Sequence, residues 1–343
     1  MTRTTPTRPV DVAAVLPQLT PLARTAIRLH PRPGSPSVRD SSVGGPLLWP
    51  PDEPWPHCEG PHTWDTVNPA MSPEDIRRLR RIRAAAASRP RGRFTPEESA
   101  IMKQVNAGRP WPEDPVPMLP IAQLYVRDIP LLRPPGQADL LQVLWCPFDH
   151  GLKPYPKPAL YWRTAATVTD IRTDPPEPPV VQFEGYLPDP CLLHPEEVTE
   201  YPDSMELTQD LQEQVRHWCR QQTGAFTDSP SEPPAEDFYR KELAIAPGWK
   251  VGGWPGWGPT DPSAQSCPAC GTRMVPLLTI ASSEWDLSSR SWIPYEDQAH
   301  ADAVYVGTSR PQLPSMIQIA DMNRLQFYAC PASPDHPYTE RVQ

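Results

Sequence analysis

The stretch LLQVLWCP at residues 140–147, followed by Asp149 and His150, is matched by RLQFYACP at residues 324–331, followed by Asp335 and His336. Both stretches contain Leu-Gln, three further residues and Cys-Pro, and both apolar runs are typical of short buried strands. An ordered series of this kind is harder to produce by chance than a single recurring pair. We therefore predict that one structural unit occurs twice in the chain.

Two further segments recur in the same order before each Cys-Pro. The segment VGGP at residues 43–46 corresponds to VGGW at residues 251–254, and the apolar run 117–124 corresponds to the run 275–281. Gly-Gly at both places predicts backbone with positive φ or the close approach of another segment. The alternative is that Gly-Gly and Cys-Pro pairs recur by chance in a Pro-rich sequence.

Proline also limits the fold class. The chain has 52 Pro among 343 residues, about three times the usual frequency, and each interior Pro removes a backbone donor and disrupts a helix. Long helices and coiled coils are therefore excluded, whereas 12 Trp indicate a folded body. We expect an α+β protein, rich in sheet, with two related halves and a few inserted helices.

The expected division of the chain follows from the repeats. Residues 1–34 form an N-terminal extension, residues 35–185 the first half, residues 186–237 a helical linker, and residues 238–343 the second half. Ser72-Pro73 and the capping box Thr95–Glu98 begin two helices within an insertion at about 72–108. A third helix is expected at about 205–222, closed by Gly224, and the segment 194–197 is interpreted as the start of a helix or turn.

Charge and hydropathy bound the class of partner. The net charge of −9 gives no general attraction for nucleic acid and suits a protein partner with a basic surface. No stretch approaches the roughly 18 apolar residues that span a bilayer, and the N-terminus lacks a signal-peptide core. We therefore expect a cytoplasmic protein without a membrane or nucleic-acid partner. Its seven Cys then favour metal ligation or burial over a disulfide framework.

The strongest chemical motif is Cys267-Pro-Ala-Cys270-Gly, whose two-residue spacing lets both thiolates reach one tetrahedral ion. Cys330 supplies a third soft ligand and His336 a candidate fourth. The prediction is a structural zinc site of three Cys and one His. Ser333 stands where a second Cys-x-x-Cys would complete a four-Cys set, so the spacing leaves the fourth ligand open. Unligated buried thiols and a redox pair are the alternatives, the latter disfavoured because the motif leads into a strand rather than a helix.

A second, weaker site is predicted in the first half. It consists of the two Cys-x-x-x-His pairs Cys58 with His62 and Cys146 with His150. This spacing is less diagnostic than Cys-x-x-Cys, and a buried Cys beside a surface His is the competing interpretation. If the interpretation holds, both halves bind zinc.

Sequence motifs of common enzyme classes are missing from the chain. There is no Gly-x-Ser-x-Gly, no Walker loop, no Gly-x-Gly-x-x-Gly and no His-Glu-x-x-His. Asp149-His150 and Asp335-His336 are adjacent pairs, which rarely form a working dyad. We predict no catalytic residues and a non-catalytic binding or interaction protein. The alternative is a metal-dependent hydrolase of unknown substrate, with an open three-ligand metal site that activates water.

The segments 42–46, 119–124 and 250–255 resemble the YwqG-like bacterial family of unknown function, in its Gly-Gly-x-Pro turn, its Leu-x-x-Ala-Gln strand and its Leu-Gln-x-Phe strand. The resemblance covers most of the chain beyond the first thirty residues. It implies an α+β fold with sheet-rich duplicated halves and no established enzymatic activity. Some members look like immunity or accessory proteins of bacterial toxin systems. The Cys-x-x-Cys, the Pro excess and the helical insertion depart from the family pattern.

Overall fold

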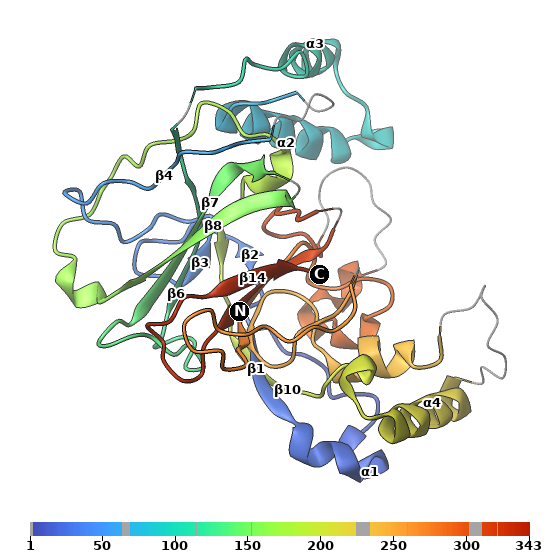
Figure 1. The fold of residues 1–343 in the computed structure, drawn as a ribbon. Helices are drawn as coiled ribbons and strands as arrows, with labels where there is room; N and C mark the ends of the chain where they lie inside the picture. The colour runs from blue at the N-terminus through green and yellow to red at the C-terminus, as the bar shows by residue number, and fades with distance from the viewer. Residues whose placement is uncertain are drawn as a thin grey trace.

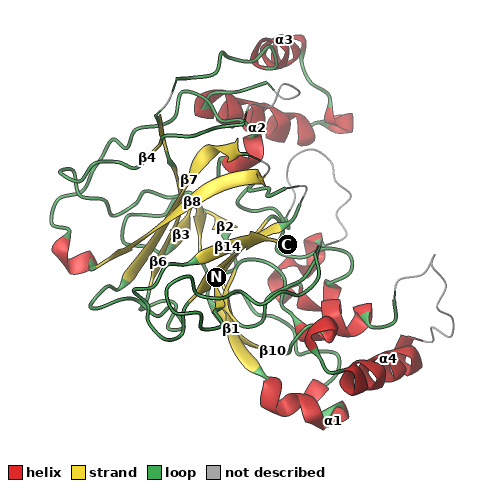
Figure 2. Ribbon diagram, viewed as in Figure 1, coloured by secondary structure: helices red, strands yellow, loops and turns green. Residues whose placement is uncertain are grey.

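Antiparallel strands form the framework of the protein (Figures 1 and 2). The computed structural model describes residues 3–63, 69–113, 115–151, 153–223, 234–258, 260–301, 311–320 and 322–343. Its strands are β1 (Arg24–Arg28), β2 (Arg32–Pro33), β3 (Ser42–Val43), β4 (His57–Cys58), β5 (Val116–Pro117), β6 (Leu119–Tyr125), β7 (Leu140–His150), β8 (Lys153–Arg163), β9 (Cys191–Leu192), β10 (Glu196–Glu200), β11 (Lys250–Gly252), β12 (Val275–Ala281), β13 (Arg324–Ala329) and β14 (Thr339–Val342).

Two six-stranded sheets contain all of these strands except β4 and β5, which pair with each other. The first sheet has the order β2-β9-β3-β6-β7-β8 and the second the order β10-β1-β11-β12-β13-β14. One continuous apolar core includes side chains from both sheets, among them Val143 of β7 and Phe327 of β13, each fully buried. The protein is therefore α+β, as expected, with its sheets sharing a core.

The two sheets have the same register at their centres. In β6 and β7, Pro120 lies opposite Leu144 and a bulge follows, after which Gln123 lies opposite Gln142. In β12 and β13, Pro276 lies opposite Tyr328 and a bulge follows at the same place. A bulge adds one residue at a fixed point of a strand pair. The Pro, the bulge and the Cys-Pro of one sheet therefore lie at the same relative positions as those of the other sheet.

A short Leu-His-Pro segment crosses from one sheet to the other at two places in the chain. The segment Leu29-His30-Pro31 joins β1 to β2, and Leu193-His194-Pro195 joins β9 to β10. Strand β1 pairs with β10 and β11, while β9 pairs with β2 and β3. Each Leu-His-Pro segment therefore links the two sheets. No single boundary in the sequence separates the strands of one sheet from those of the other.

The Gly-Gly corners behave as expected. Gly44, Gly252 and Gly253 all have positive φ, at 62°, 72° and 70°. A Cβ on Gly44 would lie 2.9 Å from the carbonyl oxygen of Asp189. Glycine is required at these corners by both conformation and space.

The glutamine of each Leu-Gln motif holds the corner that follows Gly-Gly. Gln142 donates its side-chain N–H to the carbonyl oxygen of Leu48 at 3.0 Å, and Gln326 donates to that of Gly256, also at 3.0 Å. Gln142 donates in addition to the side-chain oxygen of Gln123. Both motif glutamines are buried, so each satisfies a carbonyl that would otherwise be costly to bury.

Replacing Gln142 should therefore destabilise the protein. In Gln142→Leu the carbonyl oxygen of Leu48 loses its donor and Arg163 loses the acceptor that it contacts at 2.6 Å. We expect a loss of about 2–4 kcal/mol in unfolding free energy, since each buried unsatisfied group costs about 1–3 kcal/mol. Urea unfolding measures this loss. Gln104→Leu, an exposed position of helix α3, is the matched control and should change stability by less than about 0.5 kcal/mol.

The four α-helices lie outside the sheets in Figure 2. They are α1 (Val12–Val15), α2 (Pro73–Ala87), α3 (Pro96–Val105) and α4 (Gln209–Thr223), and a π-helical segment covers Phe238–Ala244. Ser72 caps α2 and a complete capping box at Thr95 and Glu98 begins α3, as predicted. In α4 the side chains of Val215 and Cys219 are buried; the predicted closure at Gly224 lies outside the described residues.

Two parts of the sequence interpretation need correction. Residues 186–237 were expected to be a helical linker, with a helix or turn starting at 194–197, yet they supply β9 and β10. The acidic run EEVTE alternates exposed and buried positions only weakly, and its strand pairing depends on β1, far away in the sequence. Residues 24–33, placed in the N-terminal extension, form β1 and β2. The remaining boundaries of the division stay predictions.

Candidate metal centres

All eight predicted ligands gather into the two predicted groups of four. Within each group, one ligand atom from every residue lies within 4.8 Å of all the others. The first group is Cys58, His62, Cys146 and His150, and the second is Cys267, Cys270, Cys330 and His336. The fourth ligand of the second group was left open by the spacing, and in the structure His336 is the side chain that lies beside the three thiols.

The first group, called here the N-terminal centre, joins β4 to β7. Cys58 ends β4 and Cys146 lies within β7, and both thiols are buried. Cys58 Sγ lies 3.6 Å from His150 Nε2, and Cys146 Sγ lies 3.2 Å from His62 Nε2. The two imidazole rings are 5.0 Å apart at an interplanar angle of 73°, so both nitrogens converge on the thiols.

The second group, the C-terminal centre, joins the Cys-x-x-Cys turn to the end of β13. Gly271 has φ of 72° and donates its N–H to the carbonyl oxygen of Cys267 at 2.8 Å, which closes the turn. His336 Nδ1 lies 3.5 Å from Cys267 Sγ and 3.3 Å from Cys330 Sγ. Cys270 Sγ lies 3.6 Å from Cys330 Sγ, and all the thiols are free.

These separations fit a tetrahedral zinc ion. Zinc binds thiolate sulfur at about 2.3 Å and imidazole nitrogen at about 2.0–2.1 Å, so tetrahedral geometry separates two sulfurs by about 3.8 Å and a sulfur from a nitrogen by about 3.6 Å. Five of the ligand pairs here lie 3.2–3.6 Å apart, and every pair within a group lies within 4.8 Å. Each group therefore has the size and ligand chemistry of a closed four-ligand zinc site.

Local hydrogen bonds favour the thiolate form of one cysteine at each centre. Contact with Cys146, together with His150 and the backbone N–H of Gly60, holds the pKa of Cys58 at about 3. The Thr272 hydroxyl and backbone N–H lower the pKa of Cys270 to about 6. Burial raises the pKa of Cys330, and hydrogen bonds from the backbone N–H groups of Ser333 and Ala332 oppose this shift. Thiolates are the form that binds metal.

The two centres occupy corresponding places in the fold. Cys146 follows Trp145 in β7, and Cys330 follows Ala329 at the end of β13. Trp145 and Ala329 hold the same register position in their sheets. The flanking ligands differ, because the N-terminal centre uses two Cys-x-x-x-His pairs and the C-terminal centre a Cys-x-x-Cys. The strand Cys is thus the shared element.

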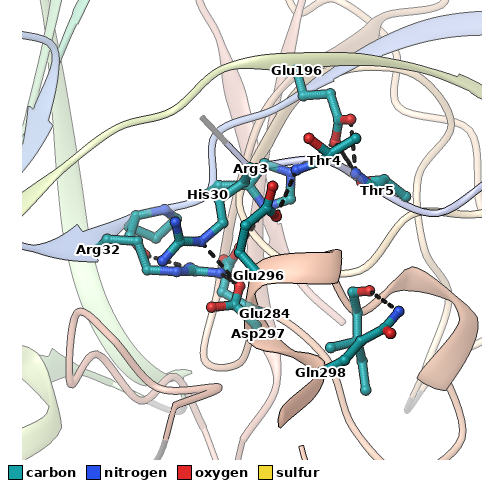
Figure 3. Close-up of polar contacts among 12 residues, drawn as sticks. Arg3, Thr4, Thr5, His30, Arg32, Glu196, Glu284, Glu296, Asp297 and Gln298 are labelled. Atoms are coloured by element: carbon teal, nitrogen blue, oxygen red, sulfur yellow. Dashed lines mark hydrogen bonds and ion pairs between the residues drawn. The ribbon is translucent and has the colours of Figure 1, made fainter. Parts of the chain in front are cut away.

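A second concentration of titratable side chains lies where the N-terminal segment crosses β1 and β10 (Figure 3). His30 is fully buried and contacts Glu196 through Nε2 at 3.1 Å. Burial, then the neighbouring Arg28, lowers the pKa of His30 to about 3, so this imidazole is neutral. Burial alone would raise the pKa of Glu196, but hydrogen bonds from His30 and Thr5 bring it to about 2.

This polar cluster is a structural feature. Thr5 donates its N–H to Glu196 at 2.8 Å, Arg3 pairs with Asp297 at 3.2 Å, and Arg32 also pairs with Asp297. His30 lines none of the cavities found among the described ranges. A catalytic His must reach a substrate, and this one is closed in by the chain itself. The repeated Leu-His-Pro at residues 29–31 and 193–195 is a sequence signal for this region, and it was not among the predicted repeats.

The tryptophans near the second Gly-Gly are packed in the interior. Each of the five is at most 8% exposed: Trp249, Trp254, Trp257, Trp285 and Trp292. Trp249 and Trp292 belong to the largest fully buried side chains. Aromatic packing, rather than an open sugar- or peptide-binding surface, accounts for most of this group.

Comparison with known families and with curated proteins finds no match to this chain. Within the described residues, no helix has the length and apolar character needed to cross a membrane.

Proposed function

We propose that this protein is a non-catalytic binding protein whose two Cys/His centres hold structural zinc ions. The observation that carries the proposal is the closure of both centres: each brings four protein ligands within 4.8 Å of one another. A catalytic zinc keeps one position open for water or substrate. The alternative of a metal-dependent hydrolase needs such a position, and four converging ligands leave none.

Metal analysis and X-ray absorption spectroscopy together test the zinc sites. Protein purified without added zinc should contain two zinc ions per chain. The absorption fine structure should show an average of about two to three sulfur ligands per ion, because the two centres together contain five sulfurs and three nitrogens. Less than one ion per several chains, or an oxygen ligand from water in the average shell, would contradict the structural role.

We further propose that the two sheets derive from one duplicated unit of the YwqG-like kind. Support comes from the shared bulge position, the two glutamine contacts to corresponding carbonyl oxygens and the two Leu-His-Pro crossings. In this proposal the first strand of each repeat, β1 or β9, joins the sheet of the other repeat. Strand β1 pairs with β11, and β9 pairs with β3. Comparison of the two sheets by superposition tests it.

The proposed partner is a protein with a basic surface, and the proposed location is the cytoplasm. The net charge of −9 supports the first, and an immunity or accessory role beside a bacterial toxin would suit it. Capture of partners from the native host at low and high salt tests both ideas. A specific partner whose binding weakens with salt is the expected result, and a salt-independent or acidic partner would contradict it.

A further inference from the structure

A cavity of about 440 Å³ lies beside the C-terminal metal centre and includes its ligand Cys330 in the lining. This volume falls within the range of about 300–1,000 Å³ that is typical of ligand sites. Most of the lining is apolar, from Leu131, Val275, Pro276, Leu277, Ala329 and Pro331. The ladder between β11 and β12 involves only Lys250 and Val251 on the β11 side, so residues 275–277 of β12 border the cavity.

The corresponding place in the first half is filled by a tryptophan. Trp145 lies opposite Leu119, just before the Pro and the bulge, and Ala329 lies opposite Val275 at the same point of the second sheet. Trp145 is fully buried and donates its indole N–H to the carbonyl oxygen of Tyr186 at 2.9 Å. The equivalent position of the second sheet thus has the much smaller side chain of Ala329, which lines the cavity.

The charged side chains at the cavity rim are both positive. Arg24 and Arg133 are exposed, and neither forms a salt bridge within the part of the chain that the structure describes. The guanidinium of Arg24 stacks on Trp254 at 3.5 Å from the ring centroid, and Arg24 lies between this cavity and a neighbouring one that Trp254 and Glu206 line. Guanidinium groups bind carboxylates through paired hydrogen bonds.

We propose that this cavity is the docking site for an extended acidic segment of a partner protein, which inserts one aromatic side chain beside Ala329. An aromatic side chain matches the room that Trp145 fills in the first half, and carboxylates flanking it meet Arg24 and Arg133. An extended segment suits the bordering edge of β12. The inference rests on the proposed binding function. It concerns a local recognition site, whereas the net charge acts on the partner as a whole.

The probe is the peptide acetyl-Glu-Trp-Glu-amide with 5-fluorotryptophan, observed by fluorine NMR. We expect a shifted or broadened signal with a Kd of roughly 0.1–1 mM, the range for a small ligand. The Lys-Trp-Lys counterpart should bind at least about tenfold more weakly, since its charges oppose both arginines. Ala329→Trp, which reproduces the first half, should abolish binding of the acidic peptide.

A second test variant, Arg133→Gln, and a matched control, Arg93→Gln, examine the charge contacts. Arg133→Gln should weaken the acidic peptide severalfold, whereas Arg93→Gln removes the same charge from an exposed site in the helical insertion and should leave the Kd unchanged. If Ala329→Trp fails to fold by near-ultraviolet circular dichroism, Arg133→Gln alone decides.

No signal change with wild-type protein at millimolar peptide overturns the proposal. So does equal binding of the acidic and basic peptides, or unchanged binding by Arg133→Gln. Zinc content in the same samples separates this failure from failure of the structural zinc sites.

Discussion

Cys146→Ser should retain one of the two zinc ions and lose a large part of the protein's stability. Cys146 is fully buried in β7, with His62 Nε2 at 3.2 Å from its thiol. A serine hydroxyl is a poor zinc ligand at neutral pH, so the N-terminal centre should lose its ion. The C-terminal centre shares no ligand with it and should stay loaded.

The expected loss is about 5 kcal/mol in unfolding free energy. Structural zinc supplies about 10–16 kcal/mol in zinc-finger peptides that are unfolded without metal, and here the two sheets and their shared core remain without the ion. With an unfolding entropy of about 2.1 cal/mol/K per residue, a chain of 343 residues should melt roughly 5–10 °C lower. Metal analysis and calorimetry give the two readouts.

Cys191→Ser is the matched control for this prediction. Its thiol is also fully buried, and it contacts the carbonyl oxygen of Pro314 at 3.2 Å, which a serine hydroxyl can contact as a donor. The change should leave two zinc ions bound and cost about 1 kcal/mol or less. Cys330→Ser should behave like Cys146→Ser, with the other ion lost. Two ions retained in Cys146→Ser would refute the N-terminal centre.

The sequence predicted the strands and ligands whose signals are local. The runs 140–147 and 275–281 are mostly apolar and each has a Pro near one end, and the corresponding strands β7 and β12 form as expected. The Cys-x-x-Cys turn likewise has a spacing that fixes its own geometry. The two weaker Cys-x-x-x-His pairs also come together in the structure. The repeated Cys-Pro places Cys146 and Cys330 directly after the corresponding register positions of Trp145 and Ala329.

The pairing of β1 with β11 and of β9 with β3 was not predicted, because nothing local encodes it. Strands β2, β3 and β9 have two residues each, too few for a period-2 pattern to emerge. The run Glu196–Glu200 is acidic like a helix start, and it becomes a strand only by pairing with β1. Buried polar contacts are equally non-local: Glu200 is fully buried, yet its partner Lys250 lies fifty residues on.

The Lys250–Glu200 pair yields the second large prediction. Lys250 is 1% exposed and Glu200 0%, and Lys250 Nζ donates to the two carboxylate oxygens at 2.6 and 2.8 Å. The same carboxylate accepts the backbone N–H groups of Ala246 at 2.9 Å and Trp254 at 2.7 Å. The pair therefore fixes β10 to β11 at the Gly-Gly corner, with each charge dependent on the other.

Lys250→Met should destabilise the protein by about 3–5 kcal/mol, because it leaves the Glu200 carboxylate buried without its counter-charge. In Lys250→Met/Glu200→Gln the buried charge is gone, so the double variant should regain part of the loss. The recovery should be incomplete, because Ala246 and Trp254 donate to different oxygens of Glu200 and the amide retains only one of them. Lys241→Met is the matched control. It breaks a half-exposed pair with Asp237 at 2.8 Å, and such pairs contribute at most about 1 kcal/mol. Urea unfolding of the four proteins measures the difference. A Lys250→Met loss no larger than that of Lys241→Met, or a double variant less stable than Lys250→Met, would show that the buried charges do not depend on each other.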